Sequence, residues 1–367
     1  MNREIKYAHF KVAQIEGRYV THTHIMEYMK QLKTPFHLET LGASVKGNPI
    51  YGVTIGHGPK RILMWSQMHG NESTTTKAVL DLLNYLKLEL GPTKNILQHF
   101  TLKIIPILNP DGAKAYTRVN ANQTDLNRDA QDLSQPESKL LKWVYDNFEP
   151  HFCFNLHDQR TIFNVGETEK PATVSFLAPA FDEERNVSQS RLKSMQLIAA
   201  MNKKLQEHIP GQIGRYDDGF NANCVGDAFQ MLQTPTILFE AGHFSNDYER
   251  ETTRRYIFMA LQEALRVLME EQLQEFLLDD YLKIPENQKM YCDVLVVNAH
   301  ILDPSLAAGA EVAILYQEKL EKEQIVFVPT VQEVVPRATA IFGHETKDAS
   351  ITLDKQWMDD KGISSLF

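Results

Sequence analysis

The chain has 367 residues, of which 43% are hydrophobic, so it is long enough for one large α/β domain with a substantial core and a smaller appendage. The formal net charge of −9 argues against a nucleic-acid-binding surface. The sequence contains no run of about 18 apolar residues that could span a membrane, and the N-terminus lacks the apolar segment of a signal peptide.

Three cysteines, Cys153, Cys224 and Cys292, are spread through the sequence. An odd number without clustered spacing indicates free thiols and not a disulfide framework, and free thiols are typical of a reducing compartment. We therefore expect a cytoplasmic protein that binds neither a membrane nor a nucleic acid.

Strand and helix patterns alternate along the chain up to about Leu278. Helical patterns cover residues 1–35, 73–90, 136–147, 184–208 and 249–279. Strand patterns cover residues 36–56 (two strands), 61–67, 100–108, 151–156, 173–178 and 235–240. This alternation is typical of an α/β sheet sandwiched by helices.

The pattern changes after Pro285, where short alternating runs such as DVLVVNA, EVAILY and QIVFVPT predict a small β domain. We therefore divide the chain into an α/β domain at residues 1–284 and a β-rich accessory domain at residues 285–367. Its last residues, 348–367, are expected to be poorly ordered. We interpret this domain as accessory because none of the candidate site residues below lies in it.

The stretch LMWSQMHGNE, residues 63–72, begins as a buried strand and ends in a turn that carries His69 and Glu72 three residues apart, directly before a helical pattern. Such a turn at the edge of a sheet suits a metal site, so both residues are candidate zinc ligands. The pattern alone is weak evidence, because His24 and Glu27 repeat it inside an ordinary amphipathic helix.

Polar residues stand at the ends of four predicted strands: His69, Asn109, His157 and Glu240. In open α/β sheets, ligands bind at the carboxyl ends of the strands. A catalytic zinc usually takes three protein ligands and a water, so His157 is the natural third ligand, although a histidine that merely caps a strand is the alternative. Glu240 ends a very apolar strand, where an unpaired carboxylate is costly unless it is functional.

A long polar segment, residues 109–135, lies between two of these strands and is typical of a functional loop. With it, the sequence resembles the zinc carboxypeptidases, the peptidase M14 family, over roughly residues 15–280. The motifs follow the order of the family: His69-x-x-Glu72, Asn109-Pro110-Asp111-Gly112, Arg118, Asp125-x-Asn127-Arg128, His157 and Glu240.

The resemblance implies a three-layer α/β/α domain with a mixed sheet, followed here by the small C-terminal β domain. It implies a zinc metallocarboxypeptidase that hydrolyses the C-terminal amide bond of peptides with a free terminal carboxylate. A zinc-bound water would be the nucleophile, since zinc lowers the pKa of such a water towards about 7. Glu240 would be the general base and then the proton donor.

The resemblance also assigns the remaining motif residues. His69, Glu72 and His157 would bind the zinc ion, with Asp125 orienting His69 from behind, as carboxylates do for metal-bound histidines. Arg118 would polarise the scissile carbonyl. Asn127 and Arg128 would hold the terminal carboxylate of the substrate, which a guanidinium can grip with two hydrogen bonds.

The sequence departs from the family pattern before Glu240. Residues 216–227 read YDDGFNANCVGD, where no tyrosine aligns cleanly with the mobile-loop tyrosine of the family, and Tyr216 is the nearest candidate for that substrate contact. NCVGDAF replaces the Gly-Gly-x-x-Asp-Trp stretch of the specificity pocket, and Asp158 directly after the third ligand is unusual. These departures leave the side-chain specificity open.

Two alternatives remain at this point. HGNE and DLNR also occur in aspartoacylases and succinylglutamate desuccinylases, which hydrolyse N-acyl amino acids and carry a C-terminal β domain. NPDG and the region around Glu240 favour the peptidase. An inactive binding module is disfavoured because all of the expected ligands and the base are present.

Overall fold

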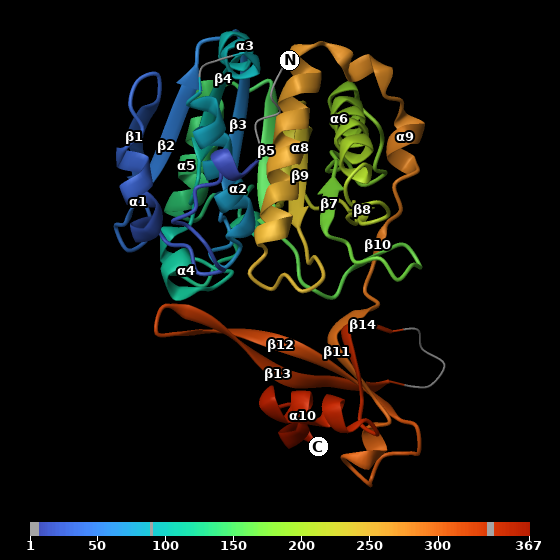
Figure 1. Cartoon of the computed structure of the whole chain (residues 1–367). Coiled ribbons are helices and arrows are strands. Elements are labelled where there is room, and N and C mark those ends of the chain that lie inside the picture. The colour runs from blue at the N-terminus through green and yellow to red at the C-terminus, as the bar shows by residue number, and fades with distance from the viewer. Residues whose placement is uncertain (1–6, 89–90, 336–340) are drawn as a thin grey trace.

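The computed structural model describes residues 7–88, 91–335 and 341–367. Within them, the chain forms a large sheet flanked by helices and a smaller sheet near the C-terminus (Figure 1). The strands of the large sheet are β1 (His37–Ala43), β2 (Pro49–Gly56), β3 (Lys60–Ser66), β4 (Phe100–Ile105), β5 (Phe152–Asp158), β7 (Val174–Leu177), β8 (Ile213–Arg215) and β9 (Thr236–Ala241). The helices that flank it are α1 (His22–Lys30), α2 (Thr74–Leu86), α3 (Pro92–His99), α4 (Pro110–Ala115), α5 (Pro136–Phe148), α6 (Gln189–Gln206), α7 (Val225–Met231), α8 (Glu251–Met269) and α9 (Leu278–Leu282).

The large sheet is mixed, with the strand order β1-β2-β4-β3-β5-β9-β7-β8. The central strands β4, β3, β5 and β9 run parallel to one another. The pairs β1–β2, β2–β4 and β7–β9 are antiparallel, and β8 runs parallel to β7. Parallel strands are covered on both faces, so they read as continuous apolar runs. Residues 62–65 on β3 follow this rule and are fully buried.

Helices cover both faces of the sheet. One face packs against α2, α6 and α8, and its core includes Leu82, Ile198 and Leu261. The other face packs against α5 and α7, with Trp65 and Phe229 in contact edge to face. The arrangement is the predicted three-layer α/β/α fold with a mixed sheet.

A buried ion pair fixes the N-terminal segment to the first of these faces. Asp81 on α2 and Arg254 on α8 are both fully buried, and the guanidinium donates to both carboxylate oxygens at 2.6 and 2.7 Å. Tyr7 and the backbone N–H of Val12 also donate to Asp81, and the carbonyl groups of Val12 and Ile15 accept from Arg254. Residues 7–15 are therefore held by polar contacts as well as by apolar packing.

Several element boundaries differ from the predictions. The helix predicted over residues 73–90 ends at Leu86, and the unpredicted helix α3 begins at Pro92, a residue suited to the first helical position. The helix predicted over 249–279 is divided into α8 and α9. In the N-terminal lead-in, residues 1–6 lie outside the described part, and α1 covers only 22–30.

The C-terminal region forms a second sheet with the order β13-β12-β11-β14. Its elements are β11 (Tyr291–Val297), β12 (Glu311–Glu321), β13 (Gln324–Val335), β14 (Phe342–Asp348) and helix α10 (Thr352–Asp360). The expectation of a poorly ordered C-terminus was wrong, because α10 packs the buried Met358 into the small core of this sheet. Residues 338–340 of the predicted run ATAIFG lie outside the described part. The domain boundary at residues 284/285 stays a prediction.

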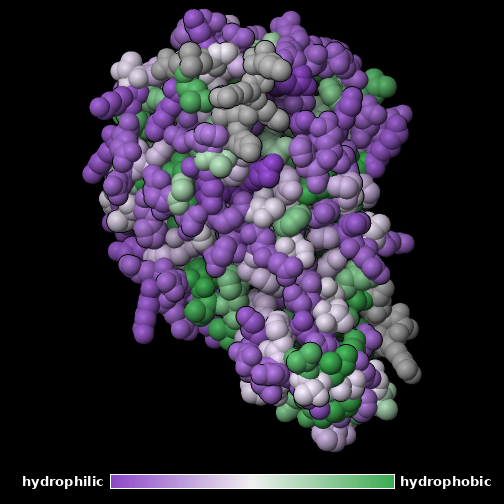
Figure 2. Space-filling model, viewed as in Figure 1, coloured by the Kyte–Doolittle hydropathy of each residue, from purple (hydrophilic) through white to green (hydrophobic). Residues whose placement is uncertain are grey.

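The second sheet lies beyond the carboxyl ends of β3, β5 and β9, with the β12–β13 hairpin running below α4 (Figure 1). The face of the molecule in Figure 2 is largely hydrophilic, and apolar side chains gather over the C-terminal region at the foot of the view. None of the described helices is both long and apolar enough to cross a bilayer. Cys153, Cys224 and Cys292 are free, as predicted.

Candidate active site

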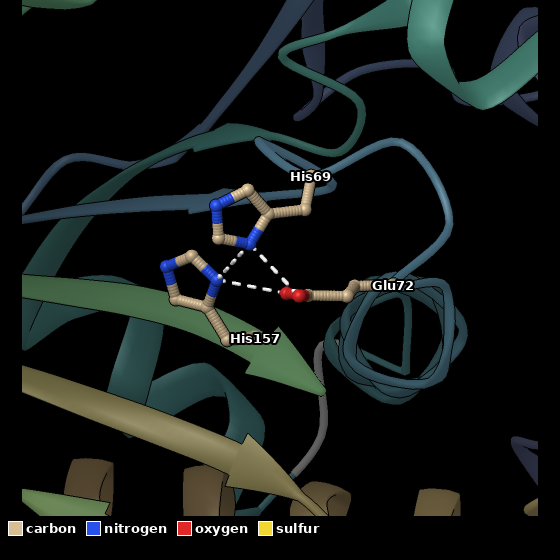
Figure 3. A group of neighbouring side chains, drawn as sticks. All are labelled: His69, Glu72 and His157. Carbon is tan, nitrogen blue, oxygen red and sulfur yellow. Dashed lines mark hydrogen bonds and ion pairs between the residues drawn. The ribbon is translucent and has the colours of Figure 1, made fainter. Parts of the chain in front are cut away.

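The carboxyl ends of β3 and β5 bring the three predicted metal ligands together. These strands are parallel neighbours, with Ser66 paired to Leu156, so the loop after β3 lies beside the end of β5. His69 and Glu72 come from that loop, and His157 comes from β5 itself. One ligand atom of each lies within 4.8 Å of the others, and all three side chains are buried. Figure 3 shows that both rings and the carboxylate point towards one another.

The loop that carries His69 and Glu72 has a fixed shape. Gly70 packs so closely against α4 that a Cβ atom there would lie 2.0 Å from the carbonyl carbon of Gly112. The side chain of Asn109, at the start of α4, donates to the carbonyl of Met68. The NPDG motif therefore supports the ligand loop, because it places a glycine and an asparagine against it.

The polar contacts within the group match those of a metal site. Nδ1 of His69 and Nδ1 of His157 each lie 2.8 Å from a carboxylate oxygen of Glu72, and the two nitrogens are 3.1 Å apart. Nε2 of His69 lies 3.0 Å from Asp125, so the ring proton belongs on Nε2 when Asp125 is ionised. Nδ1 then presents a lone pair, and lone pairs on three converging atoms repel unless a cation lies between them.

The charges around the group are consistent with this interpretation. Burial opposes ionisation of Glu72, but the neighbouring His69 and His157 lower its pKa well below the usual range. Burial lowers the pKa of His157, which keeps that ring neutral and able to bind a cation. Two imidazole nitrogens and one carboxylate form a donor set that suits a catalytic zinc, which keeps a fourth position open.

Arg118 and Asp125 form a second layer around the ligands. Nε of Arg118 donates to Asp125 at 3.0 Å, and its Nη1 donates to Glu72 at 3.4 Å. Burial opposes ionisation of Asp125, but hydrogen bonding and charge from His69, together with Arg118, hold its pKa well below the usual range. Asp125 therefore stays a carboxylate, which is the form that fixes the tautomer of His69.

Glu240 lies beside the ligand group on β9, where it pairs in register with His157 on β5. It is 9% exposed, and its Oε2 has no hydrogen-bond partner among the described residues. Burial raises the pKa of Glu240 well above its usual range, and the charges of Glu72 and Asp158 raise it further. A buried carboxyl group with raised proton affinity and no partner is suited to proton transfer.

A cavity of about 440 Å³ unites most of the predicted site. Its lining includes eight of the nine predicted residues: His69, Glu72, Arg118, Asn127, Arg128, His157, Tyr216 and Glu240. The ninth, Asp125, lies behind His69 as described above. Residues from six separate segments of the sequence thus meet in one cavity. Of the four strand-end residues that were expected to converge, His69, His157 and Glu240 line it, whereas Asn109 does not and instead supports the ligand loop.

Asn127 and Arg128 enter this cavity from the short 3₁₀ turn at residues 126–128. Asp125 caps that turn by accepting a hydrogen bond from the backbone of Asn127, and the side-chain oxygen of Asn127 accepts one from the N–H of Val225. Arg128 donates to the carbonyl of Asn127 and is exposed. It makes no ion pair with any carboxylate of the described residues.

Tyr216 follows β8 and packs against Phe163, with 5.3 Å between the ring centroids. Burial raises the pKa of its phenol, and the charges of Glu240 and Glu72 add to the effect. Tyr216 lines the same cavity as these two carboxylates. Asp158 has a structural explanation, because its carboxylate accepts hydrogen bonds from the N–H groups of Thr74 and Thr75 at the start of α2.

Sequence reasoning missed Asp227 and Arg160, which also line the cavity. Asp227 lies in the first turn of α7, and burial raises its pKa to about 7. Asp227 belongs to the NCVGDAF stretch, but nothing in that stretch indicated a role for its carboxyl group. Arg160 follows the third ligand by three residues, and no pattern in the sequence marks it.

Comparison with known proteins finds similarity to carboxypeptidases. The family model described as peptidase M14, zinc carboxypeptidase, matches residues 23–202. Carboxypeptidase SOL1 of Arabidopsis thaliana is 31% identical over 140 residues, which is 33% of this chain and 28% of that protein. The chain spans 21 to 28% of the length of the first curated relatives that it matches.

Solved structures share the fold at lower identity. A metallo-carboxypeptidase from Pseudomonas aeruginosa, solved with (2-guanidinoethylmercapto)succinic acid, gives a TM-score of 0.53 at 16% identity and covers 69% of this chain and 68% of its own. Carboxypeptidase A from Helicoverpa armigera gives 0.52 at 13% identity and covers 74% of this chain and 76% of its own. At these identities the likeness concerns the fold.

Proposed function

We propose that the chain, which is similar to the zinc carboxypeptidases, is a zinc-dependent metallocarboxypeptidase that hydrolyses the last amide bond of peptides with a free C-terminal carboxylate. The observation that carries this proposal is the meeting of His69, Glu72 and His157 beside the unpartnered carboxyl group of Glu240, in one cavity with Arg128.

His69, Glu72 and His157 would hold the zinc ion, and the fit of their three donor atoms supports this assignment. When bound, zinc supplies Lewis acidity, which polarises a carbonyl group and makes water more acidic. Asp125 would keep His69 in the tautomer that leaves Nδ1 free for the ion. Zinc as the resident metal is part of the proposal.

Glu240 would take a proton from the attacking water and deliver it to the leaving amine. Glu240 can accept this proton without first breaking a hydrogen bond at Oε2, because Oε2 has no partner among the described residues. A positioned general base contributes about 10²–10⁴ to the rate. Glu72 beside it raises its proton affinity, which suits a group that must hold a proton between two steps.

Arg118 would stabilise the negative charge that develops on the carbonyl oxygen of the substrate. It is anchored through Nε and Nη1 to Asp125 and Glu72 and is 48% exposed, so one face of the guanidinium remains open to the cavity. Asn127 and Arg128 would bind the terminal carboxylate. Arg128 suits that role because it lines the cavity without an ion-pair partner among the described carboxylates.

A pair of peptides tests the proposal directly. A peptide with a free C-terminus should be hydrolysed at least about a hundredfold faster, in kcat/KM, than its amidated twin, since hydrogen bonds to charged groups are worth roughly 1.5–3 kcal/mol each. Arg128→Gln should remove most of this preference. Arg61→Gln is a matched control, because Arg61 is a surface residue paired with Glu149 and does not line the cavity.

Equal cleavage of both peptides by the zinc-loaded protein would refute the exopeptidase assignment. N-acyl amino acids hydrolysed while peptides stay intact would replace it with the deacylase function. Tyr216 is proposed as a substrate contact on the same cavity, and Tyr216→Phe tests its hydroxyl group through KM.

A further inference from the structure

A second cavity, of about 380 Å³, adjoins the site cavity. The two share five residues of the catalytic side, namely Glu72, Arg118, Asp158, Gln159 and Arg160. The far wall of the second cavity comes from the C-terminal sheet, from Asp293 on β11, residues 315–318 on β12 and Phe327 on β13. The C-terminal sheet therefore closes a space that opens onto the metal ligands.

An aromatic cluster forms part of this wall. Tyr248, from the loop after β9, lies 5.3 Å from both Tyr316 and Phe327, measured between ring centroids. Asp293 fixes the cluster, because it accepts hydrogen bonds from the hydroxyl of Tyr248 and from the backbone N–H of Tyr316. The wall is thus held from both the catalytic side and the C-terminal sheet.

A second set of contacts fixes the hairpin at this position. Glu318 on β12 forms an ion pair with the buried Arg18 at 3.0 Å and accepts a hydrogen bond from Tyr116. Tyr116 directly follows α4, the helix below which the hairpin runs in Figure 1. The hairpin is therefore attached to the element that also supports the ligand loop.

The arginines that line the second cavity differ in whether their guanidinium groups have a partner. Arg18 is paired with Glu318, and Arg118 is paired with Asp125 and Glu72. Arg250 is buried and donates to two backbone carbonyl groups. Arg160 is exposed and, among the described residues, makes neither an ion pair nor a hydrogen bond, although it lines both cavities. It is a free guanidinium where the two spaces meet.

We propose that the second cavity binds the part of the substrate on the amino side of the cleaved bond, and that Arg160 selects an acidic side chain there. This inference rests on the proposed carboxypeptidase function. With the terminal residue held near Arg128 in the first cavity, the rest of the peptide must leave across Glu72 and Arg118, which border the second cavity.

The chemistry of this space favours an acidic residue with an apolar stem. Arg160 offers a bidentate partner for a carboxylate, and the faces of Tyr316 and Phe327 can cover the methylene groups of a glutamate. A lysine at the same place would meet the like charge of Arg160. The penultimate residue of the substrate is therefore the position at which specificity is expected.

Kinetics on matched peptides test the proposal with zinc-loaded protein. Peptides that differ only in Glu, Gln or Lys at the penultimate position should give a kcat/KM about tenfold higher for Glu than for Gln, with Lys lowest. Arg160→Gln should abolish the difference between Glu and Gln. Arg185→Gln, at an exposed arginine that pairs with Asp218 and lines neither cavity, should keep it. Phe327→Ala should raise KM for both peptides roughly tenfold at an unchanged ratio, because buried aromatic contact is lost.

Calorimetric binding of the Glu and Gln peptides to the slow Glu240→Gln protein separates the two proposals. An affinity advantage of about tenfold for Glu that disappears with Arg160→Gln supports the inference even if the zinc-loaded wild-type protein hydrolyses neither peptide, an outcome that would refute the proposed function alone. Equal affinities and equal kcat/KM for Glu and Gln, or a preference that survives Arg160→Gln, would overturn the role of Arg160.

Discussion

Asp81→Asn is expected to destabilise the protein strongly without touching the candidate active site. The carboxylate of Asp81 accepts four hydrogen bonds, at 2.6 and 2.7 Å from Arg254, 2.6 Å from Tyr7 and 2.8 Å from the backbone of Val12. Asparagine keeps the shape but has a single oxygen. One pair of donors would therefore face an amide NH₂ group, and Arg254 would lose its buried countercharge.

The size of the effect follows from these contacts. The variant loses two hydrogen bonds to a charged acceptor, which are worth roughly 1.5–3 kcal/mol each. A second estimate of the same loss comes from buried ion pairs, where removing one partner costs about 3–5 kcal/mol. We therefore expect the free energy of unfolding to fall by about 3–5 kcal/mol. Replacing both partners by apolar residues, as in Asp81→Leu with Arg254→Met, should recover only part of that loss, because it removes the unpaired charge but leaves Tyr7 and the backbone groups of Val12 and Ile15 without these partners.

Urea denaturation of the metal-saturated protein, followed by the fluorescence of the buried Trp65, measures this change. Asp146→Asn is the matched control, since Asp146 forms an exposed ion pair with Lys142 on α5. That control should lose less than about 1 kcal/mol. A loss below about 1 kcal/mol for Asp81→Asn would refute the view that the buried pair holds the N-terminal segment.

Three further predictions concern the site and its surroundings. Protein purified without added metal should contain about one zinc per chain. Metal analysis of His157→Ala should show that most of this zinc is lost, because the substitution removes one of the three donors, and full zinc occupancy would exclude His157 as a ligand. Glu240→Gln should retain the metal and lose at least ~10²-fold in turnover, and wild-type turnover would remove Glu240 from the mechanism. Burial lowers the pKa of His344 from 6.5 to about 4, so its contribution to stability is complete above pH 6.5 and is lost as the pH falls towards 4. Between pH 7 and 5 the wild type should therefore lose about 2 kcal/mol that His344→Gln does not lose, as measured by urea denaturation at both pH values.

Much of the fold could be predicted because the central strands are buried on both faces. Residues 62–65 and the run around Phe239 are apolar without interruption, and this pattern marks them as parallel strands regardless of their partners. The polar residues that end these strands then had to meet at one edge. His69, His157 and Glu240 could thus be grouped before any contact was known.

Other features could not be predicted because they depend on distant contacts. The sequence after Met269 still favours helix, yet α8 ends there and Glu271 adopts a left-handed backbone conformation with φ of 58°. The wall formed by Phe327 against the loop of Arg160 joins residues far apart in sequence, and no local pattern connects them. The C-terminal region was interpreted as accessory because it contains no motif residues. Motifs do not indicate whether the C-terminal sheet packs beside the candidate site and lines a cavity there.

The order of the elements along the chain has a consequence for synthesis on the ribosome. The candidate metal ligands and Glu240 all precede α8, whereas Phe327 follows Glu240 by about 90 residues, or several seconds at a translation rate of ~5–20 residues per second. The candidate site can therefore assemble on a nascent chain that still lacks the wall that the C-terminal sheet contributes to the second cavity. Under the proposed function, we expect such a chain to bind zinc before it discriminates among substrates.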